Sequence, residues 1–343
     1  MSLDSRQLEQ LQPFCSVSSS AVQSEDEEAW LKARTRGVGG SDVGAICGVN
    51  HWSSALQIYF NKTGQFQDER QPDEASLERM HFGHVLEPVV ADEFEHRNEG
   101  VTCIEPDCSF SSTTYNFLLA NVDRFVLNDD GDIIGILECK TASSIMDSEW
   151  ESGDIPLSYY YQVQHYMYVT GIHRAWICAL VGGNKFYQYD LYYDAELYEG
   201  TILPQLDHFW NNCVCKLREP EVQAADSDMF SELFPADAAA QEPVNLEDPV
   251  LNDLGAEYLE LKRQAKDIDK RLKEIQAEYK NALRDNVKGY TRDYEITWSP
   301  RTRTSVDSTL LRTNYPDIYE ACCKTTSYRQ MGVKAVNNED LSF

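Results

Sequence analysis

The sequence predicts an α/β fold: a mixed central sheet flanked by helices, followed by a long C-terminal helix and a small β extension. Amphipathic helical segments alternate with strand-like runs up to residue 218, and an apolar heptad repeat begins near residue 254. With 343 residues, the chain can bury one large core, or one core and a smaller appendage.

Composition divides the chain into four regions. Residues 1–24 are rich in Ser and Gln, and we expect them to be disordered. Residues 25–218 hold the α/β core. Residues 219–250 are predicted to be an acidic linker, because positions 219–248 contain nine acidic residues and no Lys or Arg. Residues 251–343 form the C-terminal extension.

Hydrophobic periodicity predicts the elements of the core. Helices are expected at 25–34, 43–46, 80–96 and 158–169, and strands at 117–127, 133–141, 175–181 and 185–192. Pro88 is awkward inside a helix, so the third helix can instead begin there, with Glu87 just before its first turn.

Apolar or small residues in the C-terminal region alternate in steps of four and three, at 254, 258, 261, 265, 268, 272, 275, 279 and 282. This is a coiled-coil heptad held over nearly four repeats. It can pack on its own domain or form a seam between subunits. A strand within 289–300 and a basic loop with Arg301 and Arg303 follow it.

The net charge of −27 argues against avid binding of nucleic acid, since phosphate contacts need Lys and Arg. Residues 251–343 are near neutral, with 16 basic and 15 acidic residues, so the excess lies in the first 250 residues. A DNA-binding face would have to be a local basic patch on an acidic body.

No apolar run approaches the roughly 20 residues of a membrane helix, and the first residues lack a secretory signal pattern. A cytoplasmic protein is therefore expected. The ten cysteines include no CxxC pair, so we expect free thiols packed as small hydrophobes.

The segment ANVDRFVLNDDGDIIGILECKTA predicts a hairpin with a polar cluster at one end. A turn at Asp130-Gly131 places Asp123 opposite Glu138 on one face, and Lys140 follows two residues later on the same face. A structural salt bridge would explain part of this cluster. Two carboxylates and one amine stay net negative, however, which favours a site for Mg²⁺ or Mn²⁺.

Several motifs of this chain resemble the YqaJ-type viral recombinase family, which is phage lambda exonuclease-like and belongs to the PD-(D/E)XK nuclease superfamily. The matching segments are RTRGVGGSDVGAICGVNHW, GHVLEPVVADEFE, NVDRFV, GILECKTAS and YYYQVQHYMYVTG, and a final helix before TW.P.TRT, over roughly residues 27–335. The resemblance implies a PD-(D/E)XK restriction-endonuclease-like core that hydrolyses double-stranded DNA from 5′ ends with two metal ions.

The resemblance also implies roles for individual residues. Asp123, Glu138 and the Cys139 carbonyl would bind metal, and Lys140 would orient or deprotonate the attacking water. Glu87 would bind the second metal or its water; without the family it would be an ordinary helix glutamate. Gln164 and Tyr168 resemble a QxxxY motif that fixes the lysine or the DNA, with Gln162 as an alternative glutamine. We expect His84 and His165 to be surface or core histidines.

The glycine-rich turn before Ser41 has the chemistry of an anion site. Gly37, Gly39 and Gly40 would let backbone amides approach an anion, and Arg34 and Arg36 add charge-assisted donors. In the family this region receives the terminal 5′ phosphate, which implies that role for Arg34, Arg36 and Ser41.

Three functions remain open. The first is a 5′–3′ double-stranded DNA exonuclease, a homo-oligomer and possibly a trimer, which leaves 3′ tails for a single-strand annealing protein in phage-type recombination. The second is an endonuclease or single-strand nuclease of a repair machine. The third is a non-catalytic DNA-end-binding protein, which the set of Asp123, Glu138 and Lys140 disfavours.

Overall fold

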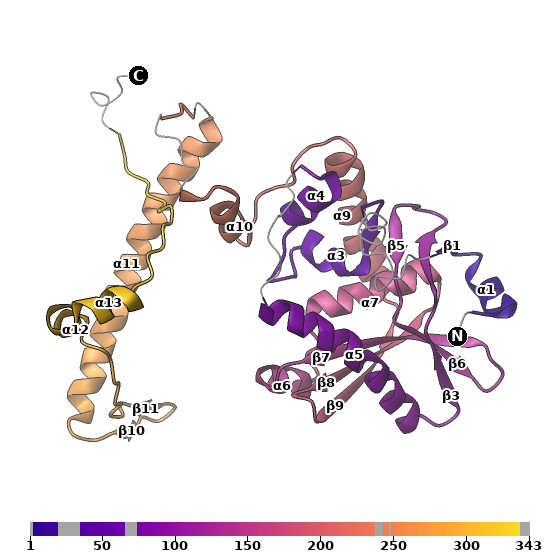
Figure 1. Ribbon diagram of the computed structural model, residues 1–343, viewed down its shortest axis with the longest axis horizontal. Helices are drawn as coiled ribbons and strands as arrows, with labels where there is room; N and C mark the ends of the chain where they lie inside the picture. Colours follow the sequence, from indigo (N-terminus) through magenta and orange to yellow (C-terminus); the bar gives the residue numbers. More distant parts are fainter. Residues whose placement is uncertain (1–2, 20–34, 66–73, 237–242, 247, 337–343) are drawn as a thin grey trace. The chain divides into compact units, whose positions relative to one another are not determined.

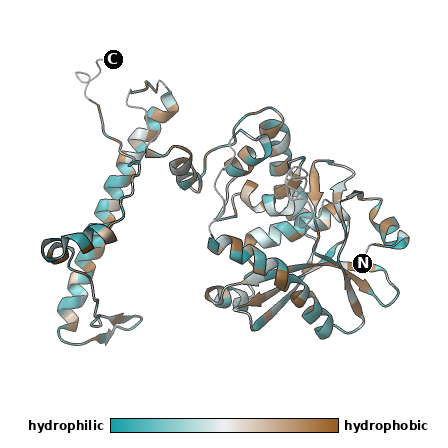
Figure 2. Cartoon of the chain, viewed as in Figure 1, coloured by the Kyte–Doolittle hydropathy of each residue, from teal (hydrophilic) through white to brown (hydrophobic). Residues whose placement is uncertain are grey.

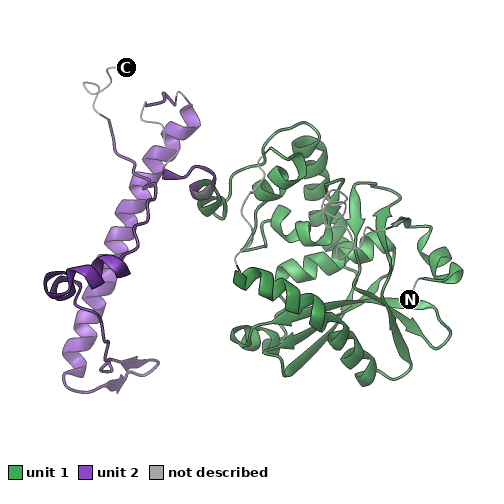
Figure 3. Cartoon of the chain, viewed as in Figure 1, with its two compact units in different colours: residues 1–230 green, residues 231–343 purple. Residues whose placement is uncertain are grey.

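The computed structural model describes residues 3–19, 35–65, 74–236, 243–246 and 248–336. The chain divides into two compact units, residues 1–230 and residues 231–343 (Figure 3). In the part of the chain described, no helix is long and apolar enough to cross a membrane. The expected helix at 25–34 lies outside the described residues.

The first unit is built around a five-stranded sheet with the order β3-β6-β7-β8-β9 (Figure 1). Strands β7 and β8 are parallel and the other neighbours are antiparallel, so the expected mixed sheet is confirmed. The strands are β3 (Val101–Ile104), β6 (Arg124–Asn128), β7 (Ile133–Ala142), β8 (Arg174–Val181) and β9 (Lys185–Tyr192).

Helices cover both faces of this sheet. Val90, Ala91 and Phe94 of one helix pack against Leu137 and Trp176 on the first face. On the opposite face, Trp150 and Tyr159 pack against alternate residues of β8. The α-helices of this unit are α1 (Ser5–Leu11), α3 (Gly40–Ile46), α4 (Ala55–Thr63), α5 (Glu74–Arg97), α6 (Asp147–Ser152), α7 (Leu157–Thr170), α8 (Ala195–Leu197) and α9 (Leu203–His208). Short helical segments η1 (Ser144–Met146), η2 (Tyr198–Ile202) and η3 (Phe209–Val214) complete it.

The N-terminal segment is ordered over residues 3–19, so the prediction of disorder at 1–24 is wrong there. Asp4 and Gln7 form a reciprocal capping box at the start of α1, and Leu11 is fully buried. A strand then pairs with β4 in a second, four-stranded sheet of order β1-β4-β5-β2. Its strands are β1 (Cys15–Ser19), β2 (Val38–Gly39), β4 (Cys108–Ser112) and β5 (Leu118–Ala120).

Helix α5 continues through Pro88 and does not begin there. Proline has no N–H to donate to the carbonyl four residues earlier, so one helical hydrogen bond is missing on that turn. The packing of Val90, Ala91 and Phe94 against the sheet stabilises the helix beyond the proline. Glu87 therefore lies within the helix and not before its first turn.

The hairpin of β6 and β7 contains a register shift that the sequence did not predict. Arg124 pairs with Leu137 and Val126 with Gly135, but Leu127 pairs with Ile133. The extra residue is Ile134, which packs against the α5 side of the sheet. Without the bulge, Ile134 would lie on the face of Asp123 and Glu138, because side chains alternate along an uninterrupted strand.

The acidic linker expected at 219–250 contains a helix, α10 (Asp226–Leu233). Asp226 is fully buried and accepts a hydrogen bond from Ser54. The second unit contains α11 (Pro249–Leu283), the hairpin β10 (Lys288–Tyr290) and β11 (Glu295–Thr297), and the helices α12 (Ser308–Asn314) and α13 (Pro316–Cys322). The long helix and the β extension are therefore confirmed.

Candidate active site

Asp123, Glu138 and Lys140 come together at one end of the β6–β7 hairpin. The pairing of Arg124 with Leu137 continues to Asp123 opposite Glu138, as the turn position suggested. The backbone N–H of Cys139 donates to Asp123 Oδ2 over 2.9 Å. The hairpin therefore holds both carboxylates against the same stretch of β7.

Lys140 is bound within this cluster. Its Nζ donates to Glu138 Oε1 over 2.6 Å and to Gln162 Oε1 over 3.3 Å, and lies 4.6 Å from the centre of the Tyr159 ring. The Gln162 side chain returns a hydrogen bond, from Nε2 to Glu138 Oε1, over 2.8 Å. The amine, the acid and the amide thus form a closed network between β7 and α7.

One oxygen of Glu138 lies outside this network. Glu138 is 1% exposed, and its Oε2 has no hydrogen-bond partner among the described residues. A buried oxygen without a partner is costly. Burial raises the pKa of the Glu138 carboxyl well above its usual range, and the Asp123 carboxylate raises it further, while Lys140 opposes both.

The opposing effects of burial and of neighbouring charges also set the protonation state of Lys140. Burial acts to lower the pKa of its ammonium, but the Glu138 and Asp123 carboxylates outweigh burial and raise it above the usual value. Lys140 is therefore a cation at neutral pH. The pKa of Asp123 is raised by burial, with Lys140 acting in the opposite direction.

Asp123 and Glu138 supply some, but not all, of the protein ligands that a divalent cation needs. The lone Glu138 oxygen, the nearby Asp123 carboxylate and the hard-oxygen chemistry suit Mg²⁺ or Mn²⁺. However, among the described residues no group of three or more His, Cys, Asp or Glu side chains is arranged to hold an ion. A third ligand must be a backbone oxygen, such as the expected Cys139 carbonyl, or a side chain that moves.

Glu87 is close to this site but bound to another residue. Its Oε1 accepts from Arg124 Nη1 over 2.6 Å, and the same nitrogen donates to the Asp123 carbonyl over 2.6 Å. Burial raises the pKa of the Glu87 carboxyl, Asp123 raises it further, and Arg124 opposes this. The sequence analysis missed Arg124, although it stands next to Asp123.

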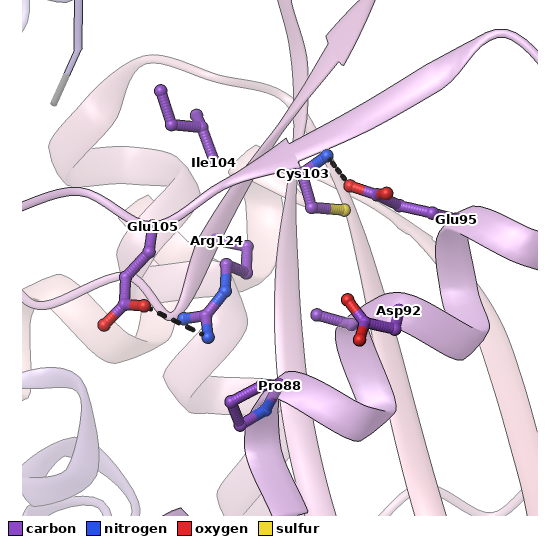
Figure 4. A pocket seen from close by; sticks show the side chains of 8 residues that line it. Pro88, Asp92, Glu95, Cys103, Ile104, Glu105 and Arg124 are labelled. Carbon is purple, nitrogen blue, oxygen red and sulfur yellow. Dashed lines mark hydrogen bonds and ion pairs between the residues drawn. The ribbon is translucent and has the colours of Figure 1, made fainter. Parts of the chain in front are cut away.

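Arg124 also borders a cavity of about 200 Å³ on the α5 side of the sheet (Figure 4). Figure 4 shows its guanidinium facing Glu105, with which it forms an ion pair of 3.3 Å. Asp92, Glu95 and Glu105 line this cavity with Arg124. Such an acidic lining repels phosphate, so the cavity is not a site for the DNA backbone.

Gln162, and not Gln164, contacts the cluster of Glu138 and Lys140. Gln164 donates to the Tyr192 carbonyl over 2.9 Å and accepts from the Asp194 N–H over 2.8 Å, at the end of β9. Two residues along a helix turn the side chain by about 200°, so the two glutamines point in different directions. The structure therefore places Gln162 beside Lys140 and Gln164 at the end of β9, and the catalytic role first expected for Gln164 stays a prediction.

The choice of glutamine also decides which tyrosine belongs to the QxxxY motif, since the tyrosine follows four residues after the glutamine. Gln162 Nε2 donates to Tyr166 Oη over 3.0 Å, whereas Tyr168 stacks on Tyr198 with ring centres 4.6 Å apart. Both pairs have the spacing of a QxxxY motif, so the sequence could not distinguish them. In the structure, the pair beside Lys140 is Gln162 and Tyr166.

The two histidines are placed as expected. His84 is exposed on α5. His165 is fully buried, with Nδ1 bound to the Tyr198 hydroxyl over 2.8 Å and Nε2 to the Leu119 carbonyl over 2.9 Å. Burial lowers the pKa of His165 to about 4, although the Leu119 carbonyl opposes this. It is a core histidine.

The glycine-rich turn lies beside the cluster. A Cβ on Gly40 would collide with the Tyr166 ring and come within 3.1 Å of Gln162 Cγ. Gly37 is packed against the Phe117 carbonyl in the same way. Close packing is therefore a sufficient reason for glycine at these two positions.

The proposed phosphate ligands of this turn are only partly described. Arg36 and Ser41 are exposed, and Arg34 lies outside the described residues. Asp42, which the sequence analysis did not single out, accepts from the Gly39 N–H over 2.9 Å and pairs with Lys62 over 2.7 Å. This buried ion pair holds the turn and neutralises the acid within it.

Comparison with known proteins relates most of the chain to one family. Residues 29–173 match the YqaJ-like viral recombinase domain. The uncharacterized protein YqaJ of Bacillus subtilis (strain 168) is 32% identical over 313 residues, which is 90% of this chain and 95% of that protein.

Solved structures are also similar to part of the chain. The alkaline exonuclease LHK-Exo from Laribacter hongkongensis is 16% identical, with a TM-score of 0.43, over 55% of this chain and 94% of that one. A phage-related exonuclease from Haemophilus somnus 129PT is 13% identical, with a TM-score of 0.36, over 53% and 96%.

Proposed function

The chain belongs to the YqaJ-like viral recombinase family, and from this premise we propose that it is a divalent-metal-dependent deoxyribonuclease. The observation that carries the proposal is the buried cluster of Asp123, Glu138 and Lys140, in which one Glu138 oxygen has no partner among the described residues. A protein that only binds DNA has no use for buried acids beside a phosphate.

In this proposal Asp123, Glu138 and the Cys139 carbonyl would hold Mg²⁺, for which Mn²⁺ could substitute. Glu87, which is paired with Arg124 in the structure, would serve a second ion or its water. Bound divalent ions polarise the phosphate and lower the pKa of the attacking water.

Lys140 would act on the phosphate and on the attacking water. In the structure Glu138 and Asp123 raise the pKa of its ammonium, which would stabilise charge on the phosphate. With both carboxylates bound to a metal ion, Lys140 would orient or deprotonate the attacking water. Gln162 holds both Lys140 and Glu138, which keeps the ammonium in place as DNA binds.

The finer activity that we propose is 5′–3′ exonuclease action on double-stranded DNA, producing 3′ tails for a single-strand annealing protein. Arg34, Arg36 and Ser41 would receive the terminal 5′ phosphate. The position of Gly40, which precedes Ser41 and packs on Gln162 and Tyr166, supports this role for the described part of the turn. We also propose a homo-oligomer, with a trimer as the family-based expectation, acting in the host cytoplasm.

The decisive experiment is digestion of end-labelled linear duplex, single strand and closed circular DNA, with and without Mg²⁺. We expect shortening of the linear duplex from its 5′ ends, faster with a 5′ phosphate than a 5′ hydroxyl, and no cleavage of the closed circle. Chelation of divalent ions should stop the reaction.

Lys140→Ala should abolish cleavage while the melting temperature and binding to DNA ends are retained. Lys185→Ala is the matched control, since Lys185 is an exposed lysine of the same sheet. Cleavage of the closed circle would identify an endonuclease. End binding by the wild type without any cleavage would identify a non-catalytic protein.

A further inference from the structure

An apolar stripe along α11 is exposed. Leu254, Leu261, Ile268, Leu272 and Tyr279 are between 39% and 62% exposed, although all of them occupy heptad positions. Figure 2 shows hydrophobic and hydrophilic residues alternating along this helix. Within the described residues of the second unit, these side chains therefore lack the cover that a packed helix gives to its apolar face.

We propose that α11 pairs with α11 of a second copy of this chain as an antiparallel coiled coil. An apolar repeat of 3.5 residues, kept from Leu254 to Ala282, stays in contact only with another helix that has the same period. The surface of a globular unit does not follow that period. A second copy supplies an identical stripe, so the interface is complementary to itself.

The sizes of the seam residues favour the antiparallel orientation. In this orientation Ala265 lies opposite Ile268, and Tyr258 lies opposite Ile275. The remaining layers pair Leu261 with Leu272 and Leu254 with Tyr279. Every layer then joins two large residues or one small and one large residue, which fills the seam evenly. Parallel pairing would place Ala265 against Ala265 and leave a void between two crowded layers.

Charges beside the seam give a weaker and mixed signal. Antiparallel pairing brings Lys262 near Asp269 of the second copy, which is attractive, and Glu257 near Glu278, which is repulsive. Parallel pairing would bring Glu257 near Lys262. Exposed ion pairs contribute less than a filled core layer, so packing decides the orientation. The repulsive pair nevertheless provides a test.

The first experiment measures the mass of the full chain by light scattering over a range of concentrations. The wild type should reach an even multiple of 39.2 kDa, as a pair of single chains or as a pair of the trimers proposed above, and Leu261→Ser/Ile268→Ser should halve that mass. We expect its dissociation constant to rise at least about 100-fold, since each pair of helices loses four buried apolar side chains.

Leu259→Ser is the matched control, because Leu259 is an exposed leucine of the same helix outside the seam. It should assemble like the wild type. The double variant should keep its fold, since both residues are more than half exposed in the single chain. A wild type that is monomeric at every concentration, or equal masses for the wild type and the double variant, would overturn the proposal.

The second experiment tests the orientation with Glu257→Lys. In the antiparallel pair this change replaces the repulsion from Glu278 by attraction, so association should tighten about twofold to fivefold. In a parallel pair the new lysine would face Lys262, and association would weaken. Weaker association would therefore overturn the antiparallel pair. Both experiments measure association of the chain and do not depend on DNA cleavage.

Discussion

Single hydrogen bonds distinguish the two glutamines of α7. Gln162→Ala removes the amide that joins Lys140 to Glu138, and we expect a loss of cleavage of about 10–100-fold with little change in melting temperature. Steady-state cleavage and thermal melting of the same samples measure both effects.

Gln164→Ala is the matched control for this prediction. It leaves the Asp194 N–H and the Tyr192 carbonyl without their partner, which should lower the free energy of unfolding by about 1–3 kcal/mol. Its cleavage rate per folded molecule should equal that of the wild type. The opposite pattern, with the rate lost only in Gln164→Ala, would restore Gln164 as the catalytic amide.

His165 makes stability depend on pH. Its folded pKa of about 4 lies below the value near 6.5 in an unfolded chain, so the unfolded state binds the proton first as the pH falls. Stability is therefore complete above about pH 6.5 and decreases by about 1.4 kcal/mol per pH unit down to pH 4. His165→Gln, which cannot titrate, should lose less stability than the wild type between pH 7 and 5 in denaturant unfolding. Parallel curves for the two proteins would contradict this.

At the scale of elements, α3 and α7 touch where only glycine fits. Gly40→Ala should displace Tyr166 and Gln162, because its Cβ would overlap the tyrosine ring. We expect a loss of about 1–3 kcal/mol in stability, together with reduced cleavage. Circular dichroism melting and the cleavage assay measure the two losses.

Gly39→Ala serves as the control for Gly40→Ala. The nearest atom to its added Cβ is Asp42 Oδ2 at 3.7 Å, which is an ordinary contact. It should melt and cleave like the wild type. Equal damage from both changes would mean that the turn requires glycine for access by a ligand, as the sequence first suggested.

The sequence predicted elements with strong periodicity, and it failed where a partner strand or a bulge decides the structure. Helix α7 and strands β8 and β9 end within a residue of their expected bounds. Strand β1 was missed, because pairing with β4 and not its own composition makes it a strand. The cluster of Asp123, Glu138 and Lys140 was predicted from a two-residue turn, and it forms because the bulge at Ile134 restores the register that the actual turn, with Leu127 opposite Ile133, shifts by one residue. Arg124 was not predicted, because its partner Glu87 is 37 residues away.

At the scale of the whole chain, the two units differ in how much they bury. Among the described residues after Phe230, Leu283 is the one buried hydrophobic side chain. We expect the second unit to unfold first, so that thermal unfolding of the chain is not two-state. Far-ultraviolet circular dichroism should lose α11 before the near-ultraviolet signal of the buried Trp150 and Trp176 changes.

Trp298→Phe removes the one tryptophan of the second unit and is the control for that measurement. The temperature of its near-ultraviolet transition should equal that of the wild type. If helix and aromatic signals of this variant disappear together, the two units unfold as one. The temperature of the early transition should also rise with protein concentration, since association of α11 stabilises the folded helix.

The unpartnered oxygen of Glu138 bears on how the site survives mutation over generations. Most substitutions at a buried position lower stability, so purifying selection on folding usually protects such residues. Glu138 is different, since its buried acid is itself a cost to the fold. A lineage that no longer needed the activity would gain stability by replacing it. If descendants of this chain keep Glu138, they do so because selection acts on the activity of the site, since selection for stability alone would remove the buried acid.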